Sequence, residues 1–304
     1  MTETLRIATR TSALALWQAR YISKAITALH KDIHVELVEI VTKGDKWLDG
    51  PLHEIGGKGL FIKELEQALI EGRADIAVHS VKDIPALIPS GFCLPVLGFR
   101  ESYRDTLVGC VSVESLTKGA VVGSSSLRRK IQLQAIRPDL NVRNIRGNVD
   151  TRLKKLDSGE YDALVLAEAG LNRLGIVRED TCPLSVDVCL PAPGQGALGI
   201  EMLETNPKKS ILDPLYDENT YLCVETERMV SAGLGADCSL PVAALADLRN
   251  GVLSLKAFVA DAQGDRVIRV SESNTNQDKV VETVLDRLYE KGAQNILDSF
   301  HKES

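Results

Sequence analysis

The residues best suited to chemistry lie in a basic stretch near the middle of the chain. Residues 128–155 hold nine lysines and arginines against two aspartates. Arg128, Arg129 and Lys130 fall in the first turn of a predicted helix, where the helix dipole disfavours cations by about 0.3–1 kcal/mol each. A local rule broken in this way tends to mark function. Because the preceding serines and the free amide groups of a helix start attract anions, this stretch predicts a site for carboxylates or phosphates.

A solvated surface is the competing interpretation of the same basic stretch. The position of the basic residues at a helix start favours the anion site. So does the predominance of arginine, because its forked guanidinium suits planar carboxylates better than a diffuse lysine surface does. Four further arginines extend the predicted site: Arg143, Arg146, Arg152 and Arg173. Arg10 and Ser12 follow the first predicted strand and open the first helix, so we expect them to face the same cleft from another domain.

An acidic residue follows a buried strand in the first part of the chain. The pair Lys82-Asp83 comes just past the strand that ends near His79, and Pro85 favours an extended conformation for Ile84. An acid at the carboxyl end of a strand is well placed for catalysis, and the alternative is a surface turn with a salt bridge. His79 has no paired nucleophile nearby in the sequence, so we interpret it as structural.

Cys238 is the cysteine with the least apolar surroundings. It lies in LGADCSLPVA, between small residues and a proline, which predicts an exposed loop. Nothing in the sequence establishes a lowered thiol pKa, so an unreactive loop cysteine is the alternative. The six cysteines form no C-x-x-C pair and have no histidine cluster nearby, which disfavours zinc and predicts free thiols. The loop GGKGLF does not match the dinucleotide pattern and indicates a hinge or lid.

The elements that must position these residues alternate between strand and helix. Strands near 5–8, 35–41 and 75–78 alternate with helices near 13–29 and 60–71, which predicts a mostly parallel α/β sheet. The pattern restarts with a strand at 120–122, a serine turn and a helix from Leu127. Either this is an internal duplication or two common α/β patterns coincide. A duplication predicts two similar α/β domains with ligands bound at a shared cleft.

The last part of the chain has a different pattern. Strands at 252–259 and 266–270 followed by one helix predict a small α+β domain. The segment 191–201, PAPGQGALGIE, is rich in proline and glycine and predicts a hinge or crossing. We therefore expect three domains: residues 1–99 with 196–217, residues 100–195, and residues 218–304.

Composition narrows the classes of function. The 304 residues carry a net charge of −6 and only 4% aromatic residues, which argues against nucleic acid and anionic membranes as partners. No stretch approaches the roughly 18 apolar residues of a membrane span, and the first residues lack a basic leader followed by an apolar run, so we expect a cytoplasmic protein. Three hypotheses remain: an enzyme, a non-catalytic two-domain anion-binding protein, and, as the weakest, a nucleic-acid-binding protein.

Several motifs in one order resemble the porphobilinogen deaminase family, also called hydroxymethylbilane synthases. The resemblance runs from residue 5 to beyond 245 and rests on TRTSALALWQA, GGKGLFIKELE, DIAVHSVKDIP, GSSSLRRKIQLQ, RNIRGNVDTRLKKL, APGQGALGIE and LGADCSLPVA. It implies a three-domain enzyme with two similar α/β domains of the periplasmic-binding-protein type and a small α+β domain. The implied reaction condenses four porphobilinogen molecules into a linear tetrapyrrole and releases ammonia at each step.

The resemblance also implies a cofactor and a role for each matching residue. The cofactor is a dipyrromethane primer on a cysteine thioether, which falls on Cys238, and no metal or nucleotide is implied. Asp83 is the expected catalytic acid. The remaining implied residues are grouped as follows: cofactor-binding Ser12, Lys82, Ser124, Ser126, Arg128, Arg129 and Arg146; substrate-binding Arg10, Arg152 and Arg173; a closing lid with Lys58 and Phe61. A monomer is expected on the same ground.

The cysteine loop departs from the family pattern. Ala236 and Asp237 replace a more usual pair of glycines, and Ser239 stands where glutamine is common. A negative charge at Asp237 disfavours the thiolate, so we expect slower cofactor loading in this chain. The cysteine itself is retained, and the implied attachment point is unchanged.

Overall fold

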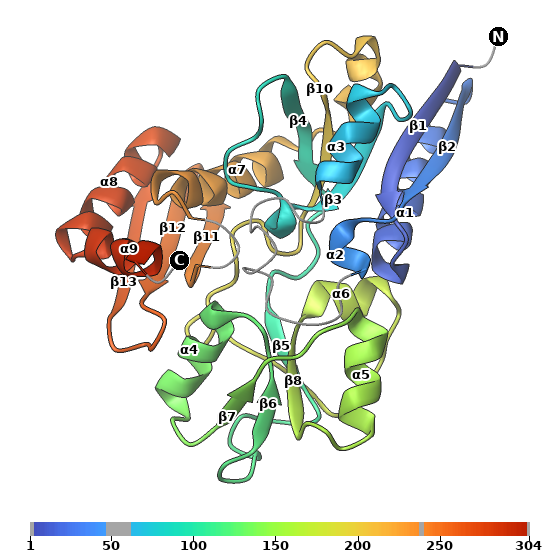
Figure 1. Cartoon of the computed structure of the whole chain (residues 1–304). Helices are drawn as coiled ribbons and strands as arrows, with labels where there is room; N and C mark the ends of the chain where they lie inside the picture. Colours follow the sequence, from blue (N-terminus) through green and yellow to red (C-terminus); the bar gives the residue numbers. More distant parts are fainter. Residues whose placement is uncertain (1–2, 47–61, 237–239, 303–304) are drawn as a thin grey trace. The chain divides into compact units, whose positions relative to one another are not determined.

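The protein, described by a computed structural model over residues 3–46, 62–236 and 240–302, folds into two compact units (Figure 1). Unit 1 is made of Met1–Arg100 and Ala197–Tyr221, and unit 2 of Glu101–Gly196 and Leu222–Ser304. The finer division into three domains stays a prediction, as does the cleft between the two α/β domains.

Unit 1 is built on one five-stranded sheet. The strand order is β2-β1-β3-β10-β4, with β1, β2 and β3 parallel and β10 antiparallel to both of its neighbours. Its strands are β1 (Glu3–Arg10), β2 (Ile33–Ile40), β3 (Ile76–Ser80), β4 (Phe92–Gly98) and β10 (Leu198–Leu203). Its helices are α1 (Ala13–Leu29), α2 (Lys43–Lys46), α3 (Lys63–Ile70) and the 3₁₀ helices η2 (Val81–Asp83) and η3 (Pro207–Leu215).

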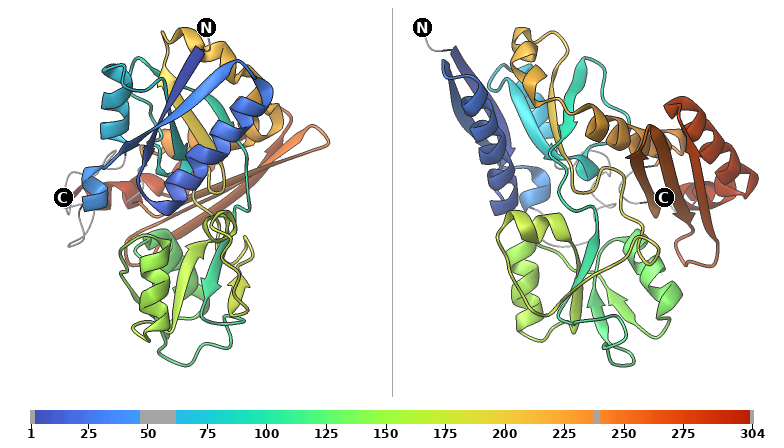
Figure 2. Two further views of the ribbon diagram at one scale, coloured as in Figure 1. Left: turned by 90° about the vertical axis from the view of Figure 1, so that its right-hand side faces the viewer. Right: turned by 180° about the vertical axis from the view of Figure 1, so that it is seen from behind.

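Two helices cover the opposite faces of this sheet (Figure 2). Side chains of successive strand residues point to opposite faces, so Ile7 and Ala8 of β1 enter different cores. Ile7 packs with Ile22 and its neighbours on α1, whereas Ala8 packs with Leu65 and Leu69 on α3. The spacing of the buried residues on α1 fits the helical period, which explains why this segment is a helix.

Asp75 fastens the start of β3 to β1. Its carboxylate accepts hydrogen bonds from the Arg6 amide at 2.7 Å and from the Arg6 Nε at 3.2 Å, and it lies 3.0 Å from Lys208 Nζ. Burial alone would raise the pKa of Asp75, but the bonds from Arg6 and Lys208 prevail and lower it. Asp75 is therefore a structural carboxylate that favours the folded state when it is ionised.

Unit 2 contains a second five-stranded sheet with the order β7-β6-β8-β5-β9. Strands β7, β6 and β8 are parallel, and β5 is antiparallel to β8 and β9. The strands are β5 (Asp105–Val108), β6 (Val121–Gly123), β7 (Asn141–Arg143), β8 (Ala163–Ala167) and β9 (Thr181–Pro183). The helices around them are α4 (Leu127–Ile136), α5 (Val149–Asp157) and α6 (Glu168–Arg173). The order of these strands and their relative directions are the same as in the sheet of unit 1, which confirms the predicted pair of similar α/β folds.

A third sheet completes unit 2. It is antiparallel, in the order β11-β12-β13, with β11 (Val242–Arg249), β12 (Val252–Ala260) and β13 (Val267–Asn274). The accompanying helices are α7 (Glu218–Gly233), α8 (Gln277–Glu290) and α9 (Ala293–Lys302). One face of the sheet packs on α8 and α9, and the other packs through Phe258 and Leu245 on Ile131 and Leu190. The small α+β domain is therefore confirmed, and the described residues give it one more strand and two more helices than the sequence predicted.

The structure refines one expectation about the sheets and corrects another. Both α/β sheets are mixed rather than purely parallel: four of the five strands run in one direction, as the prediction of mostly parallel sheets requires, and β10 or β5 enters antiparallel in the fourth place. The predicted hinge at residues 191–201 is irregular only in its first half. Its second half, from Leu198, is the buried strand β10 between β3 and β4.

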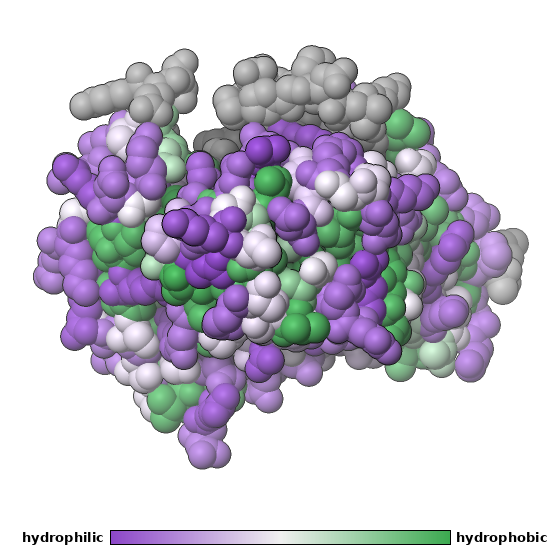
Figure 3. All heavy atoms as spheres, turned by 90° about the horizontal axis from the view of Figure 1, so that it is seen from below, coloured by the Kyte–Doolittle hydropathy of each residue, from purple (hydrophilic) through white to green (hydrophobic). Residues whose placement is uncertain are grey.

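Among the described residues, no helix has both the length and the apolar character needed to cross a membrane. Figure 3 shows one face of the protein, on which polar and charged residues separate the apolar ones into small groups. Five cysteines, Cys93, Cys110, Cys182, Cys189 and Cys223, are free thiols, as predicted.

Candidate active site

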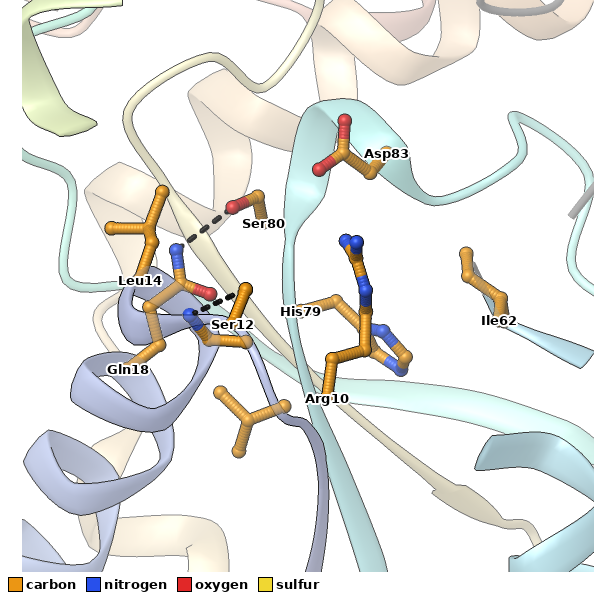
Figure 4. Close-up of a pocket in the computed structure, with 10 residues that line it drawn as sticks. Arg10, Ser12, Leu14, Gln18, Ile62, His79, Ser80 and Asp83 are labelled. Atoms are coloured by element: carbon orange, nitrogen blue, oxygen red, sulfur yellow. Dashed lines mark hydrogen bonds between the residues drawn. The ribbon is translucent and has the colours of Figure 1, made fainter. Parts of the chain in front are cut away.

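A pocket lies at the carboxyl ends of β1 and β3 in unit 1 (Figure 4). Arg10 is the last residue of β1, Ser12 caps α1, and Asp83 ends the short helix that follows β3. These three residues line a cavity of about 60 Å³ together with Gln18 and His79. Ligands of open α/β sheets bind at this edge, so Arg10, Ser12 and Asp83 lie together where a ligand can be expected, and their roles stay predictions.

Local interactions explain why the chain presents these side chains together. The Ser12 side chain accepts a hydrogen bond from the Ala15 amide at 3.4 Å and so begins α1. Gln18 Nε2 donates to Ser80 Oγ at 2.8 Å, which ties α1 to the end of β3. Ile84 is extended, with φ −80° and ψ 131°, as the following proline predicts. The short helix that carries Asp83 therefore ends at this residue, and the carboxylate of Asp83 is left exposed.

Asp83 is exposed, and no hydrogen-bond or ion-pair partner of its carboxylate is found among the described residues. In Figure 4 the side chains of Arg10 and Asp83 enter the same pocket from different elements. Lys82 is half-buried in the same turn but lies outside the lining that the described residues give this pocket. A carboxylate displayed in this way can accept a proton or stabilise a nearby cation.

The arginine-rich set lies at the equivalent edge of the sheet in unit 2. Strands β6, β7 and β8 are parallel, so the loops that follow them meet at one edge. The Ser126 side chain caps α4 by accepting from the Arg129 amide, and Ser124, two residues earlier, is buried. Ser125 exchanges two hydrogen bonds with Ile145, at 2.6 Å and 3.0 Å, and so fixes the loop that carries Arg146.

A single buried carboxylate holds the two arginines at the start of α4. Asp105 is fully buried, and its oxygens lie 2.7 Å from Arg128 Nη1 and 2.7 Å from Arg129 Nη2. Arg128 also donates to the Leu190 carbonyl at 2.7 Å, and Arg129 to the Val165 carbonyl at 3.0 Å. These bonds fix both guanidinium groups, which are only 4% and 7% exposed.

The charge balance of this cluster fits a polyanionic cofactor. Two guanidinium groups against one carboxylate leave an excess of positive charge in a buried place, which an anion would compensate. Arg146 is half-buried, its pKa is lowered by burial, and no ion-pair partner for it is found among the described residues. Serine hydroxyls and backbone amides at the same helix start add neutral donors. The residues present therefore suit a ligand that carries several carboxylates.

The remaining predicted residues have these places. Arg152 is half-buried in the first turn of α5 and donates from Nε to the Gly147 carbonyl at 2.8 Å. Arg173 is buried at the end of α6 and donates from Nη2 to the Gly196 carbonyl at 2.6 Å. Cys238, Lys58 and Phe61 lie outside the described residues. Among the described residues, no group of three or more metal-ligating side chains is found.

Sequence reasoning missed two residues that matter to this site. Asp105 was not singled out, although an aspartate directly before the apolar run TLV is a signal for a buried, paired acid. Glu201 was likewise missed inside the glycine-rich segment. It forms a buried pair with His79, whose Nε2 lies 2.9 Å from the Glu201 carboxylate.

Taken each by itself, the exposed carboxylate of unit 1 suits chemistry in which positive charge develops, and the fixed guanidinium groups of unit 2 suit a ligand that carries carboxylates. Comparison with known proteins gives the family. Residues 5–210 match the dipyrromethane cofactor-binding domain of porphobilinogen deaminase, and residues 221–290 match the C-terminal domain of the same enzyme. The chain is also 47% identical over 301 residues to porphobilinogen deaminase of Thiobacillus denitrificans, covering 97% of this chain and 98% of that protein. The chain therefore belongs to the porphobilinogen deaminase family, and it is a transferase.

Solved structures of binding proteins show a more distant likeness. The periplasmic aliphatic sulphonate binding protein SsuA from Escherichia coli is 13% identical, with a TM-score of 0.42 over 95% of this chain and 88% of that one. The alkanesulfonate-binding protein SsuA from Xanthomonas axonopodis is also 13% identical, with a TM-score of 0.38 over 75% of this chain and 73% of that one.

Proposed function

We propose that this protein is a hydroxymethylbilane synthase in which Asp83 is the catalytic carboxylate and Cys238 carries the primer. It condenses four porphobilinogen molecules head to tail, releases ammonia at each step, and frees the linear tetrapyrrole with water. The observation that supports the assignment most directly is the pocket in which Asp83 and Arg10 meet at the ends of two parallel strands. We further propose that the protein acts as a monomer in the cytoplasm.

Asp83 assists the step in which the substrate loses its amino group. The carbon–nitrogen bond breaks, the electron pair leaves with the ammonia, and positive charge develops on the substrate pyrrole. A carboxylate about 4 Å from that charge, at an effective dielectric constant near 20, stabilises it by about 4 kcal/mol. That energy corresponds to roughly a thousandfold in rate.

The arginines and serines bind the acetate and propionate groups of the pyrroles. Arg10, Arg152 and Arg173 are assigned to the incoming substrate. Ser12, Lys82, Ser124, Ser126, Arg128, Arg129 and Arg146 are assigned to the dipyrromethane cofactor. Guanidinium groups that are already fixed by neighbouring acceptors lose little entropy when they bind a carboxylate, which favours a growing polyanionic chain.

The cofactor, when bound, supplies the pyrrole carbon to which the first substrate is joined. Its attachment to Cys238 needs a thiolate. Burial raises the pKa of Cys93 and Cys182, that of Cys110 to about 11 and that of Cys189 to about 12. These four thiols are poor nucleophiles at neutral pH, which argues against them as the attachment point.

Intact mass under denaturing conditions tests the proposal. We expect the purified protein to exceed its sequence mass by two pyrrole units, and the Cys238→Ser variant to have the bare mass. Added porphobilinogen should then raise the wild-type mass in steps of one pyrrole unit and be consumed. A bare wild-type mass that porphobilinogen does not change would favour the alternative, a non-catalytic anion-binding protein. An acidic aldehyde reagent gives a second readout, because it colours a bound dipyrromethane.

A further inference from the structure

His79 is the buried titratable residue that borders the pocket and has no role in the reaction described above. It lies in β3 next to the turn of Asp83, is 6% exposed, and lines the same cavity as Asp83 and Arg10. In Figure 4 its ring lies beside the Arg10 side chain. It is therefore placed where a proton could be exchanged with a bound substrate.

Glu201 holds the imidazole of His79 from the neighbouring strand. Gly199 of β10 is directly opposite His79 in the antiparallel register, and Glu201 is opposite Ala77 on the same face. His79 Nε2 and Glu201 Oε2 are 2.9 Å apart, and the Glu201 side chain is 1% exposed. An ionised carboxylate can only accept hydrogen bonds, so it keeps a hydrogen on Nε2 and leaves the lone pair of a neutral ring on Nδ1.

A purely structural role leaves one feature of this pair unexplained. The second oxygen of Glu201, Oε1, is buried without a hydrogen-bond partner among the described residues. A buried carboxylate with one oxygen that lacks a hydrogen bond destabilises the folded protein. A functional site can retain such a group where its negative charge is needed for function. The Glu201 carboxylate would have such a function if it stabilised the positive charge of the His79 ring after that ring takes up a proton.

Among the described residues, Glu66 of α3 interacts electrostatically with both members of the pair, and Lys63 of α3 interacts with Glu66. The thiol of Cys93 on β4 interacts with Glu201, and Arg10 and Asp83 line the pocket together with His79. Burial first, and the charge of Glu201 second, raise the pKa of Glu66. Glu66 therefore takes up a proton more readily than an ordinary glutamate, which limits the negative charge around His79.

We propose that His79, oriented by Glu201, is the proton acceptor of the condensation. This inference rests on the proposed function. When the new carbon–carbon bond forms, the pyrrole carbon that attacked still carries its hydrogen. The carbon–hydrogen bond then breaks, its electron pair returns to the ring, and the proton passes to His79 Nδ1. His79 then releases the proton to solvent or to the departing ammonia. Glu201 is a positioning residue that stabilises the imidazolium.

The test compares holoenzyme variants in a single condensation with porphobilinogen across pH 5.5 to 8.5. His79→Gln places an amide near Nε2, so the bond to Glu201 can persist while proton uptake is lost. We expect a loaded protein of unchanged melting temperature whose rate falls by about 10²–10⁴. In the pH–rate profile of the wild type, the rate should rise with pH as an imidazole loses its proton, and this rising limb should be absent from the profile of the variant. Glu201→Gln should shift the limb to lower pH and reduce the rate less.

His30→Gln is the matched control, because His30 ends α1 with Nε2 3.0 Å from the Ile211 carbonyl, away from the pocket. Its rate and pH limb should equal those of the wild type. A loaded His79→Gln protein with a rate within about threefold of the wild type and an unchanged limb would overturn the proposal. If that variant does not fold, a flat wild-type profile across the same range overturns it equally. Failure of the proposed function is distinguishable, because the wild type would then neither carry pyrrole mass nor consume porphobilinogen.

Discussion

Replacing Asp105 by asparagine tests whether the charge of one buried carboxylate organises the arginine cluster. In the folded protein Asp105 is fully buried and accepts from Arg128, Arg129 and Gln195. Asparagine keeps the size of the side chain but removes its negative charge. Both guanidinium groups then remain buried without their counter-charge, and one amide hydrogen faces cationic donors.

The expected loss follows from this burial. Breaking a buried ion pair by removing one partner costs about 3–5 kcal/mol, because an uncompensated charge stays in the interior. Here two arginines depend on the same acid, so we expect the upper part of that range. At about 2 °C per kcal/mol for a chain of this size, the melting temperature should fall by roughly 8–10 °C. Circular dichroism and scanning fluorimetry measure this directly.

A double variant separates charge from packing. Asp105→Asn combined with Arg128→Leu removes one charge of each sign, so its loss should be smaller than the sum of the two single losses by about 0.5–3 kcal/mol. Arg128→Leu alone should also reduce cofactor loading, read as intact mass. A single Asp105→Asn variant that melts within about 1 °C of the wild type would refute this reasoning, because the buried charges would then not be coupled.

Four further predictions concern other parts of the molecule. Asp83→Asn should keep the fold and the attached cofactor but remove most turnover, and unchanged porphobilinogen consumption would contradict its role. Cys189, whose pKa burial raises to about 12, should resist alkylation by iodoacetamide in the native protein at pH 7.5 and react after denaturation, as peptide mapping can show. The contribution of Asp75 to stability should be complete above the ordinary aspartate pKa of about 3.9 and should be lost as pH falls through its lowered folded-state pKa. Asp75→Asn should therefore lower the melting temperature at pH 7 and converge with the wild type in acid; equal melting curves at pH 7 would contradict this. Gly196→Ala should destabilise the protein, because φ is +88° there and a Cβ would lie 2.8 Å from the Ser102 carbonyl, and a melting temperature equal to that of the wild type would show that the backbone adjusts freely.

The sequence predicted the anion site because Arg128 and Arg129 break a local rule at a helix start. It could not supply their partner. Asp105 lies more than twenty residues earlier along the chain, and only the antiparallel pairing of β5 with β8 brings it beneath α4. Composition also led to one wrong prediction. Because residues 191–201 are rich in glycine and proline, a hinge was predicted for the whole segment, and the strand that begins at Leu198 was not expected.

The sequence could not supply the partner of His79 for the same reason. Local sequence shows a histidine in a buried strand, and a buried histidine without a nearby partner is most simply structural. Its partner Glu201 follows it by 122 positions and reaches it because β10 inserts beside β3. Pairs of this kind depend on register between distant strands, which hydrophobic periodicity within one segment does not determine.

The repeated sheet explains how one chain can maintain two opposite kinds of site. Each unit uses the same edge, at the carboxyl ends of three parallel strands, but with different chemistry. In unit 1 that edge exposes Asp83, and in unit 2 it holds buried arginines that Asp105 fixes without fully neutralising them. A condensing enzyme needs a negative group for its cationic transition state and positive groups for its polyanionic product. Separate sheets give each group its own local partners, and under the proposed function the fixed arginines take their counter-charge from Asp105 and the ligand, while the carboxylate of Asp83 is available for the substrate.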